Sequence, residues 1–119
     1  MVTDSVSQGD VFWIDLGEPF GAEPGLRRPY VVVQSDLFNA TTIQTVAVCA
    51  LTTNLRRAGA PGNVLLDDGE GNLPRRSVVN VTQLLTVDRE RLLDKIGALS
   101  RPRVAEIYQG LQLLLKPLS

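Results

Sequence analysis

The sequence contains no histidine and only one cysteine, and these shortages narrow the chemistry that the chain can perform. Without histidine the chain cannot supply a usual zinc site, and one cysteine cannot form an intrachain disulfide. The commonest general base is also missing, so any catalysis must use arginine, lysine, carboxylates, tyrosine or hydroxyl groups. We therefore expect neither a metal nor another cofactor. Cys49 lies among apolar neighbours and is expected to be a small buried residue, not a nucleophile.

Aromatic residues are also scarce, at 5% of the chain, so the core must be built mainly from Val, Leu, Ile and Ala. No run approaches the roughly 18 apolar residues of a membrane span. The first ten residues have neither the basic nor the apolar segment of a signal peptide, and we expect a cytosolic protein without membrane contact. A length of 119 residues with 44% hydrophobic residues predicts one folded domain, residues 1–119.

The net charge of −1 conceals a pattern among the basic residues. Ten of the twelve are arginine, and six of these stand in adjacent pairs, at 27–28, 56–57 and 75–76. Whole-chain charge therefore understates a basic patch that could contact phosphate groups. The alternative for each pair is solvated surface charge, which is the common state of arginine in proteins.

Apolar, β-branched segments separated by turn residues predict five to seven short strands. The predicted strands cover residues 10–16, 29–33, 43–53, 64–66, 77–82, 83–87 and 95–99. Polar residues at 80, 82 and 83 indicate a bend or bulge between the fifth and sixth of these. Residues 17–26 are predicted to form a long loop with three glycines and two prolines. Trp13, on the first strand, is expected in the core, with base stacking as the alternative.

Two helices are predicted after the strand-rich region. Asp88 can cap a short helix over residues 89–93, and Ser100 can cap a longer helix that ends by Pro117. The longer helix carries an apolar stripe expected to pack on the sheet, formed by Val104, Ile107, Tyr108, Leu111, Leu114 and Leu115. Any apolar surface of the stripe that the sheet does not cover is expected to serve contact with a second copy of the chain. The fold class is therefore mainly β, a small, strongly bent antiparallel sheet or barrel covered by a C-terminal helix.

Several segments together resemble a known family. They are residues 9–16, residues 21–29 leading into 31–33, residues 51–53, and residues 77–79 with Gln83 and Asp88. In order and spacing they resemble the MazF/PemK family of toxin endoribonucleases, and the resemblance covers about residues 8–115. It implies an SH3-like barrel that works as a homodimer in a type II toxin–antitoxin system. It also implies cleavage of single-stranded RNA at a short sequence and inhibition by a cognate antitoxin.

The resemblance assigns catalytic roles to three residues. Arg28 matches the family's arginine before proline, and its planar fork suits two phosphoryl oxygens at once, an electrostatic role. Thr52 matches the catalytic threonine, whose hydroxyl can bond the scissile phosphate or orient the attacking group. Glu23 matches the acidic loop position and is the carboxylate candidate for a general base. Cleavage by the RNA's own 2′-hydroxyl, leaving a 2′,3′-cyclic phosphate and a 5′-hydroxyl, needs no metal and is compatible with a chain without histidine.

Six further residues are candidates for RNA binding. Thr53 and Gln83 match positions that line the family's groove, and the others are cations, namely Arg27, Arg56, Arg75 and Arg76. Many relatives carry an acidic residue just before the strand that begins at Ser77, where this chain has Arg76. Any role of that carboxylate cannot be transferred, and Arg76 is expected to add positive charge beside the phosphates.

Two other functions remain compatible with the sequence. The same barrel carries toxins that bind DNA gyrase without cutting RNA, although Arg28 and Thr52 favour the ribonuclease. The second alternative is a non-catalytic module that binds RNA or protein. It stays open because this chain has Arg76 where many relatives carry an acidic residue.

Overall fold

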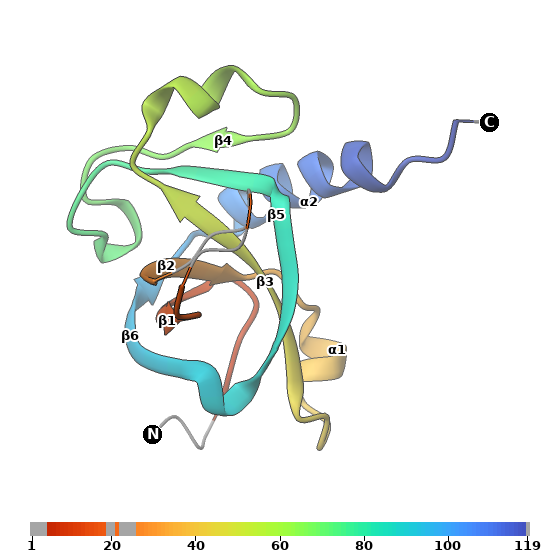
Figure 1. Ribbon diagram of the computed structural model, residues 1–119. Coiled ribbons are helices and arrows are strands. Elements are labelled where there is room, and N and C mark those ends of the chain that lie inside the picture. Colours follow the sequence, from red (N-terminus) through yellow and green to blue (C-terminus); the bar gives the residue numbers. More distant parts are fainter. Residues whose placement is uncertain (1–4, 19–20, 22–25, 119) are drawn as a thin grey trace.

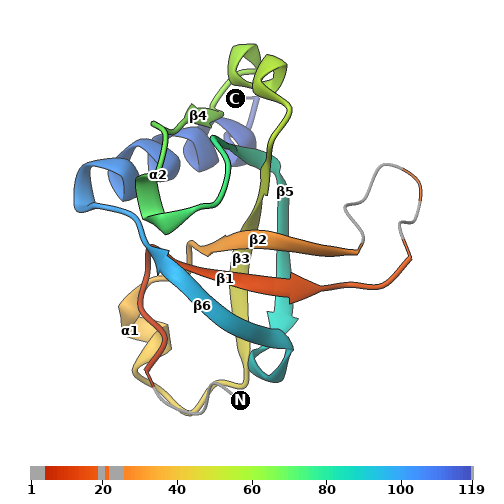
Figure 2. The same ribbon diagram turned by 90° about the vertical axis from the view of Figure 1, so that its left-hand side faces the viewer.

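A computed structural model describes residues 5–18, 21 and 26–118, and in this part of the chain one antiparallel sheet of six strands dominates (Figures 1 and 2). The strands are β1 (Asp10–Asp15), β2 (Arg27–Val32), β3 (Thr45–Thr52), β4 (Val64–Leu65), β5 (Val78–Asp88) and β6 (Leu92–Ala98). Their order across the sheet is β4-β5-β3-β2-β1-β6. The sheet curls strongly without pairing β4 to β6, so the predicted small antiparallel barrel is confirmed in an open form.

Helical segments lie in the connections between the strands, and one longer helix follows the last strand. They are α1 (Asp36–Asn39), η1 (Leu55–Gly59), η2 (Glu70–Asn72), η3 (Arg89–Arg91) and α2 (Arg101–Leu115), the η segments being 3-10 helices. Asp88 accepts a hydrogen bond from the Glu90 backbone N–H at 2.9 Å, which is the predicted cap. The capped helix ends at Arg91, and β6 begins at once at Leu92, three residues before its predicted start.

The predicted bend in the sheet is confirmed, although it lies within one strand. β5 is continuous over eleven residues, where two strands were predicted. Cys49 of β3 faces Leu84, but the next residue, Ala50, faces Asn80, so three residues of β5 have no partner on β3. Asn63 holds this bulge from outside the sheet, because its side-chain oxygen accepts the Val81 N–H at 2.9 Å. The bulge turns β5 and lets the sheet curl.

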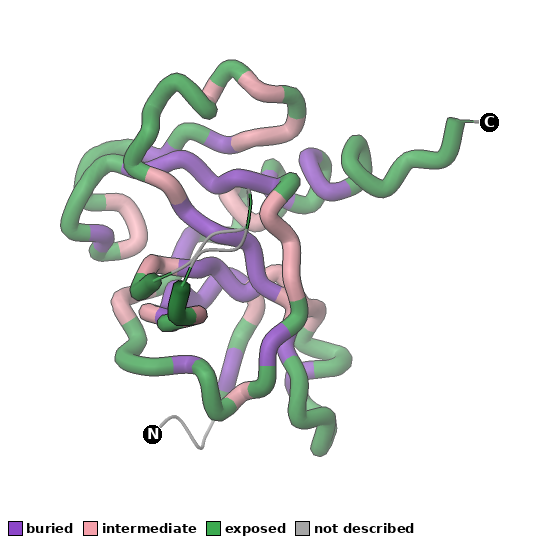
Figure 3. The backbone as a smooth tube through the Cα atoms, in the orientation of Figure 1, coloured by how far each residue is buried: buried purple, intermediate pink, exposed green. Residues whose placement is uncertain are grey.

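The central strands are buried along most of their length (Figure 3). Because successive residues alternate between the two faces of the sheet, their apolar side chains form two clusters. One cluster contains Val11, Val31, Cys49 and Leu51 and is covered by α2. The other cluster, on the opposite face, is formed around Phe12, Ile14, Tyr30, Val32, Val46 and Val48. Two buried faces explain how 119 residues with few aromatics bury a sufficient core.

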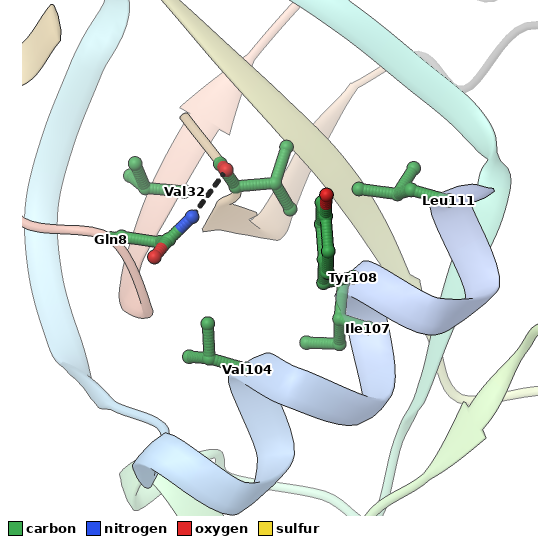
Figure 4. A pocket seen from close by; sticks show the side chains of 7 residues that line it. Gln8, Val32, Val104, Ile107, Tyr108 and Leu111 are labelled. Atoms are coloured by element: carbon green, nitrogen blue, oxygen red, sulfur yellow. Dashed lines mark hydrogen bonds between the residues drawn. The ribbon is translucent and has the colours of Figure 1, made fainter. Parts of the chain in front are cut away.

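The predicted apolar stripe of α2 is only partly buried. Ile107 and Leu111 pack into the core, whereas Tyr108 is 61% exposed and Leu115 is 67% exposed. The stripe therefore packs on the sheet in part and leaves apolar surface exposed, and the last turns of α2 run beyond the sheet (Figure 1). Tyr108 stands at the mouth of a small cavity of about 20 Å³ between α2 and β2, where the Gln8 amide donates to the Val33 carbonyl at 2.9 Å (Figure 4).

No described helix is long and apolar enough to cross a membrane.

Candidate functional site

A groove of about 310 Å³ opens where β1, β2 and β3 meet the segment that precedes β5. We call it the arginine groove, because three arginines line it, Arg27, Arg28 and Arg75. The remaining lining residues are Trp13, Leu26, Pro29, Leu51, Thr53, Leu73, Pro74 and Ser77. None of these described residues is acidic, so the groove presents positive charge above an apolar floor.

Arg28 and Thr52 lie at the same level on neighbouring strands. Arg28 pairs with Ile14 of β1 and is half-buried in the groove wall. β2 and β3 pair at Tyr30 and Ala50, and two further residues along this antiparallel register bring Arg28 opposite Thr52. Thr52 itself is not a lining residue. Its hydroxyl oxygen accepts the Asn54 N–H at 3.1 Å, so the hydroxyl proton is available for donation.

Of the predicted RNA-binding residues, Thr53, Arg27 and Arg75 line the groove. Arg75 reaches it because the segment before β5 is held at both sides. The Ser77 hydroxyl donates to the Arg75 carbonyl at 2.9 Å, and the Arg76 Nε donates to the Leu66 carbonyl at 2.9 Å. These two bonds fix residues 75–77 against β4 and turn the Arg75 side chain toward the groove.

The other predicted residues lie elsewhere. Arg56 is exposed on η1, Arg76 points to the Leu66 carbonyl, and Gln83 is half-buried in the β5 bulge. None of the three lines the groove. Glu23, the predicted base, lies outside the described residues.

Trp13 was predicted to pack in the core, and this prediction is wrong. The ring lines the groove, half-buried, and the Arg27 guanidinium carbon lies 5.1 Å from its centroid. Trp13 shares a sheet face with Val11, which is fully buried, but it lies two residues nearer the open end of β1. The charged Asp15, which follows two residues later on the same side of the strand, was the signal in the sequence that this face becomes polar toward the end of β1.

Burial controls the ionisation of the groups beneath the site. Burial raises the pKa of the Tyr30 phenol, against the opposing charge of Arg28, so Tyr30 stays neutral at physiological pH. Burial also raises the pKa of the Cys49 thiol to about 12, so the thiolate is absent and Cys49 is not a nucleophile. Among the described residues no cluster of acidic, histidine or cysteine side chains could hold a metal ion.

An ion-pair network anchors the segment between β4 and β5 to α2. Arg103 Nε lies 2.8 Å from Glu70 Oε2, and its other nitrogens lie 3.5 Å from Asp67 and 3.2 Å from Glu106. Burial acts to raise the pKa of Glu70, but hydrogen bonds from Arg103 and from the Asp67 backbone outweigh it and lower the pKa. The network therefore ties η2, which leads into the groove-lining residues, to the rigid helix.

Comparisons with known proteins agree with this geometry. Residues 7–115 match the family model described as PemK-like, MazF-like toxin of type II toxin-antitoxin system. Endoribonuclease MazF2 of Mycobacterium bovis is 40% identical over 110 residues, which cover 92% of this chain and 96% of that protein. Endoribonuclease EndoA of Bacillus subtilis is 34% identical over 110 residues, 92% of this chain and 94% of that protein.

Solved structures share the fold. MazF from Deinococcus radiodurans has a TM-score of 0.77 at 24% identity, covering 96% of this chain and 99% of that one. An endoribonuclease in complex with its cognate antitoxin, from a mycobacterial species, has a TM-score of 0.73 at 23% identity, covering 98% of this chain and 100% of that one.

The open barrel with its C-terminal helix is thus the fold of small toxins of the MazF type. The chain belongs to the PemK-like, MazF-like toxin family of type II toxin–antitoxin systems. The resemblance drawn from the sequence is confirmed, and the expected enzyme class, endoribonuclease, is the one that the relatives' names carry.

Proposed function

We propose that the protein is a toxin endoribonuclease, acting as one domain over residues 1–119 in the cytoplasm, that cleaves single-stranded RNA at a short sequence. The observation that carries the proposal is the arginine groove, in which three cations converge with hydroxyl side chains and no described carboxylate. Phosphate oxygens are the ligands that such a groove favours, and its apolar floor suits unpaired bases.

The proposed cleavage step is the one that the family resemblance implies. The RNA 2′-oxygen attacks the adjacent phosphorus and loses its proton, while the bond from phosphorus to the 5′-oxygen breaks and that oxygen gains a proton. The products are a 2′,3′-cyclic phosphate and a 5′-hydroxyl. This transesterification requires no metal, because fixed cations can stabilise the charge that develops on the phosphoryl oxygens.

Each candidate residue has a distinct role in this step. Arg28 binds two phosphoryl oxygens with its planar fork, and its role is electrostatic. Thr52 donates its hydroxyl proton to the phosphate, since its oxygen is oriented by the Asn54 N–H. Glu23 is the proposed general base. Thr53, Arg27 and Arg75 hold the RNA in the groove, and Arg56, Arg76 and Gln83 are proposed as outer contacts.

The test is cleavage of a long single-stranded RNA in excess EDTA, followed by mapping of the new ends. We expect cuts at one short motif that carry 5′-hydroxyl ends, with unchanged rates after chelation. Loss of cleavage in EDTA, with recovery on adding a divalent metal, would contradict the metal-free step. Intact RNA with folded protein would refute the ribonuclease and leave a gyrase-binding toxin or a binding module to test next.

A cognate antitoxin is the second proposed partner. One structural neighbour was solved in complex with its cognate antitoxin, and MazE–MazF complexes of Deinococcus radiodurans share the fold. The basic groove of this chain suits an acidic segment of such an antitoxin, which would compete with RNA.

We also propose that the protein is a homodimer, as the family resemblance implies. A broad hollow of about 720 Å³ beside α2 supports this, because its lining is mostly apolar and includes Leu84, Tyr108 and Leu115. Burying these apolar side chains against a second copy would lower the free energy of the protein in water.

Light scattering after size exclusion should give twice the monomer mass at micromolar concentration. Leu115→Glu, which puts a charge into the hollow, should shift the protein toward monomer. Leu113→Glu is the matched control, because Leu113 is equally an exposed leucine of α2 but does not line the hollow. A monomeric wild-type protein would contradict the proposal.

A further inference from the structure

Trp13 is the only tryptophan of the chain, and it lies in the arginine groove. Its ring is half-buried, with one guanidinium, that of Arg27, 5.1 Å from the centroid. An indole and a guanidinium are both flat, polarisable groups, and both are partners on which nucleobases stack. The Arg27 guanidinium lies over the Trp13 ring, so the two side chains form a stacked pair at the groove wall.

The floor beside this surface is apolar. Leu51 and Leu73 are buried beneath the groove, and Pro29 and Pro74 line it from two different elements, β2 and the segment before β5. A flat ring with a polar edge fits such a site better than a phosphate does, because the floor offers no donors of its own. The volume of about 310 Å³ lies at the lower end of the range for small ligands, about 300–1,000 Å³.

Charge stands at the rim and not on the floor. Arg28 and Arg75 approach from β2 and from the segment before β5, and both line the same groove as Trp13. A base on the floor would therefore have cations available for its flanking phosphates. That arrangement of a stacking surface, an apolar floor and cations at the rim is what single-stranded nucleic acid requires.

We propose that Trp13 and Arg27 form the stacking site for one unpaired base of the RNA, with Arg28 and Arg75 contacting the phosphates on either side of it. Trp13 is then a substrate-binding residue, since its ring accepts a base that has been splayed out of its strand. This inference rests on the proposed ribonuclease function and adds the location of one base subsite.

Trp13 itself provides the readout, because all tryptophan fluorescence comes from the site. The probes are 2′-fluoro RNA 12-mers of mixed sequence and of each single base, which bind but lack the attacking hydroxyl. We expect saturable quenching of Trp13 by base-containing probes, with different affinities for the four homopolymers. Inorganic polyphosphate, which carries charge without bases, should bind without quenching beyond its effect on free tryptophan.

Variants separate stacking from folding and from catalysis. Trp13→Ala should weaken probe binding by about 5- to 150-fold, the range for loss of one stacked base, and should raise KM with little change in kcat. Trp13→Phe should recover part of the affinity, because a smaller ring still stacks. Phe38→Ala is the matched control, an exposed aromatic of α1 outside the groove, and should bind like wild type.

Each outcome has a defined meaning. Probe binding by anisotropy without a change in Trp13 fluorescence, or equal quenching by polyphosphate, overturns the stacking site even if wild-type protein cleaves RNA. Failure of wild-type protein to bind any probe or to cut RNA refutes the proposed function itself. Quenching by an acidic peptide but by no RNA probe would assign the pocket to a protein segment and overturn the inference.

Discussion

Arg28→Ala should lower kcat for RNA cleavage by about 10² to 10³-fold, which is the usual cost of removing one group that stabilises transition-state charge. The phosphoryl oxygens gain negative charge as the 2′-oxygen attacks, and Arg28 is the groove arginine at the level of Thr52. Single-turnover cleavage of a labelled RNA, with circular dichroism to verify folding, measures the effect.

Two further variants make this prediction specific. Arg28→Lys keeps the positive charge but loses the planar fork, so it should recover only a small part of the activity. Arg101→Ala removes an exposed arginine at the start of α2, outside the groove, and should leave kcat unchanged. Equal losses in Arg28→Ala and Arg101→Ala would mean that Arg28 acts only through general charge, and unchanged activity would remove it from the mechanism.

The second large effect is expected at Gly97, on β6. A Cβ atom at this position would overlap the carbonyl oxygen of Gly71 in η2, and backbone atoms cannot move aside as a flexible side chain can. Gly97→Ala should therefore cost about 1–3 kcal/mol of unfolding free energy, as overpacking of a tight contact does. Because η2 leads into Leu73 and Arg75, the variant should also raise KM for RNA.

Urea unfolding and cleavage kinetics test both parts of this prediction. Gly59→Ala is the matched control, because nothing lies within 4 Å of a Cβ placed at Gly59. Its unfolding free energy should change by less than about 0.5 kcal/mol. If Gly97→Ala were as stable as Gly59→Ala, with unchanged KM, the contact with Gly71 would not position the groove.

Local patterns were sufficient to predict most elements of the fold. Alternating β-branched residues located the strands, and polar residues at 80, 82 and 83 indicated the bulge that curls the sheet. The start of β6 at Leu92 was missed because a 3-10 helix and an α-helix can have the same N-terminal cap. The cap at Asp88 therefore did not determine how long the helix that follows it would be. The exposure of Leu115 was missed because helix periodicity does not reveal where the supporting sheet ends.

The candidate site was harder to predict, because it is assembled from distant segments. The sequence placed Arg27 and Arg28 before a strand, but nothing local to Arg75 indicated that it would reach the same groove. That convergence depends on the Leu66 and Ser77 contacts and on Arg103, which are tertiary interactions. Trp13 was placed in the core by its residue type, whereas the groove that opens over its face of the sheet leaves it half-buried.

The strands β1 and β2 meet in a closed stem just before the arginines. The Leu16 N–H donates to the Leu26 carbonyl at 3.2 Å, and the Leu26 N–H donates to the Gly17 carbonyl, so the ends of the connection are bonded to each other. Insertions and deletions between residues 17 and 26 therefore leave Arg28 in place. The position of the phosphate-binding arginines is set by the pairing of the strands and does not depend on the length of that connection.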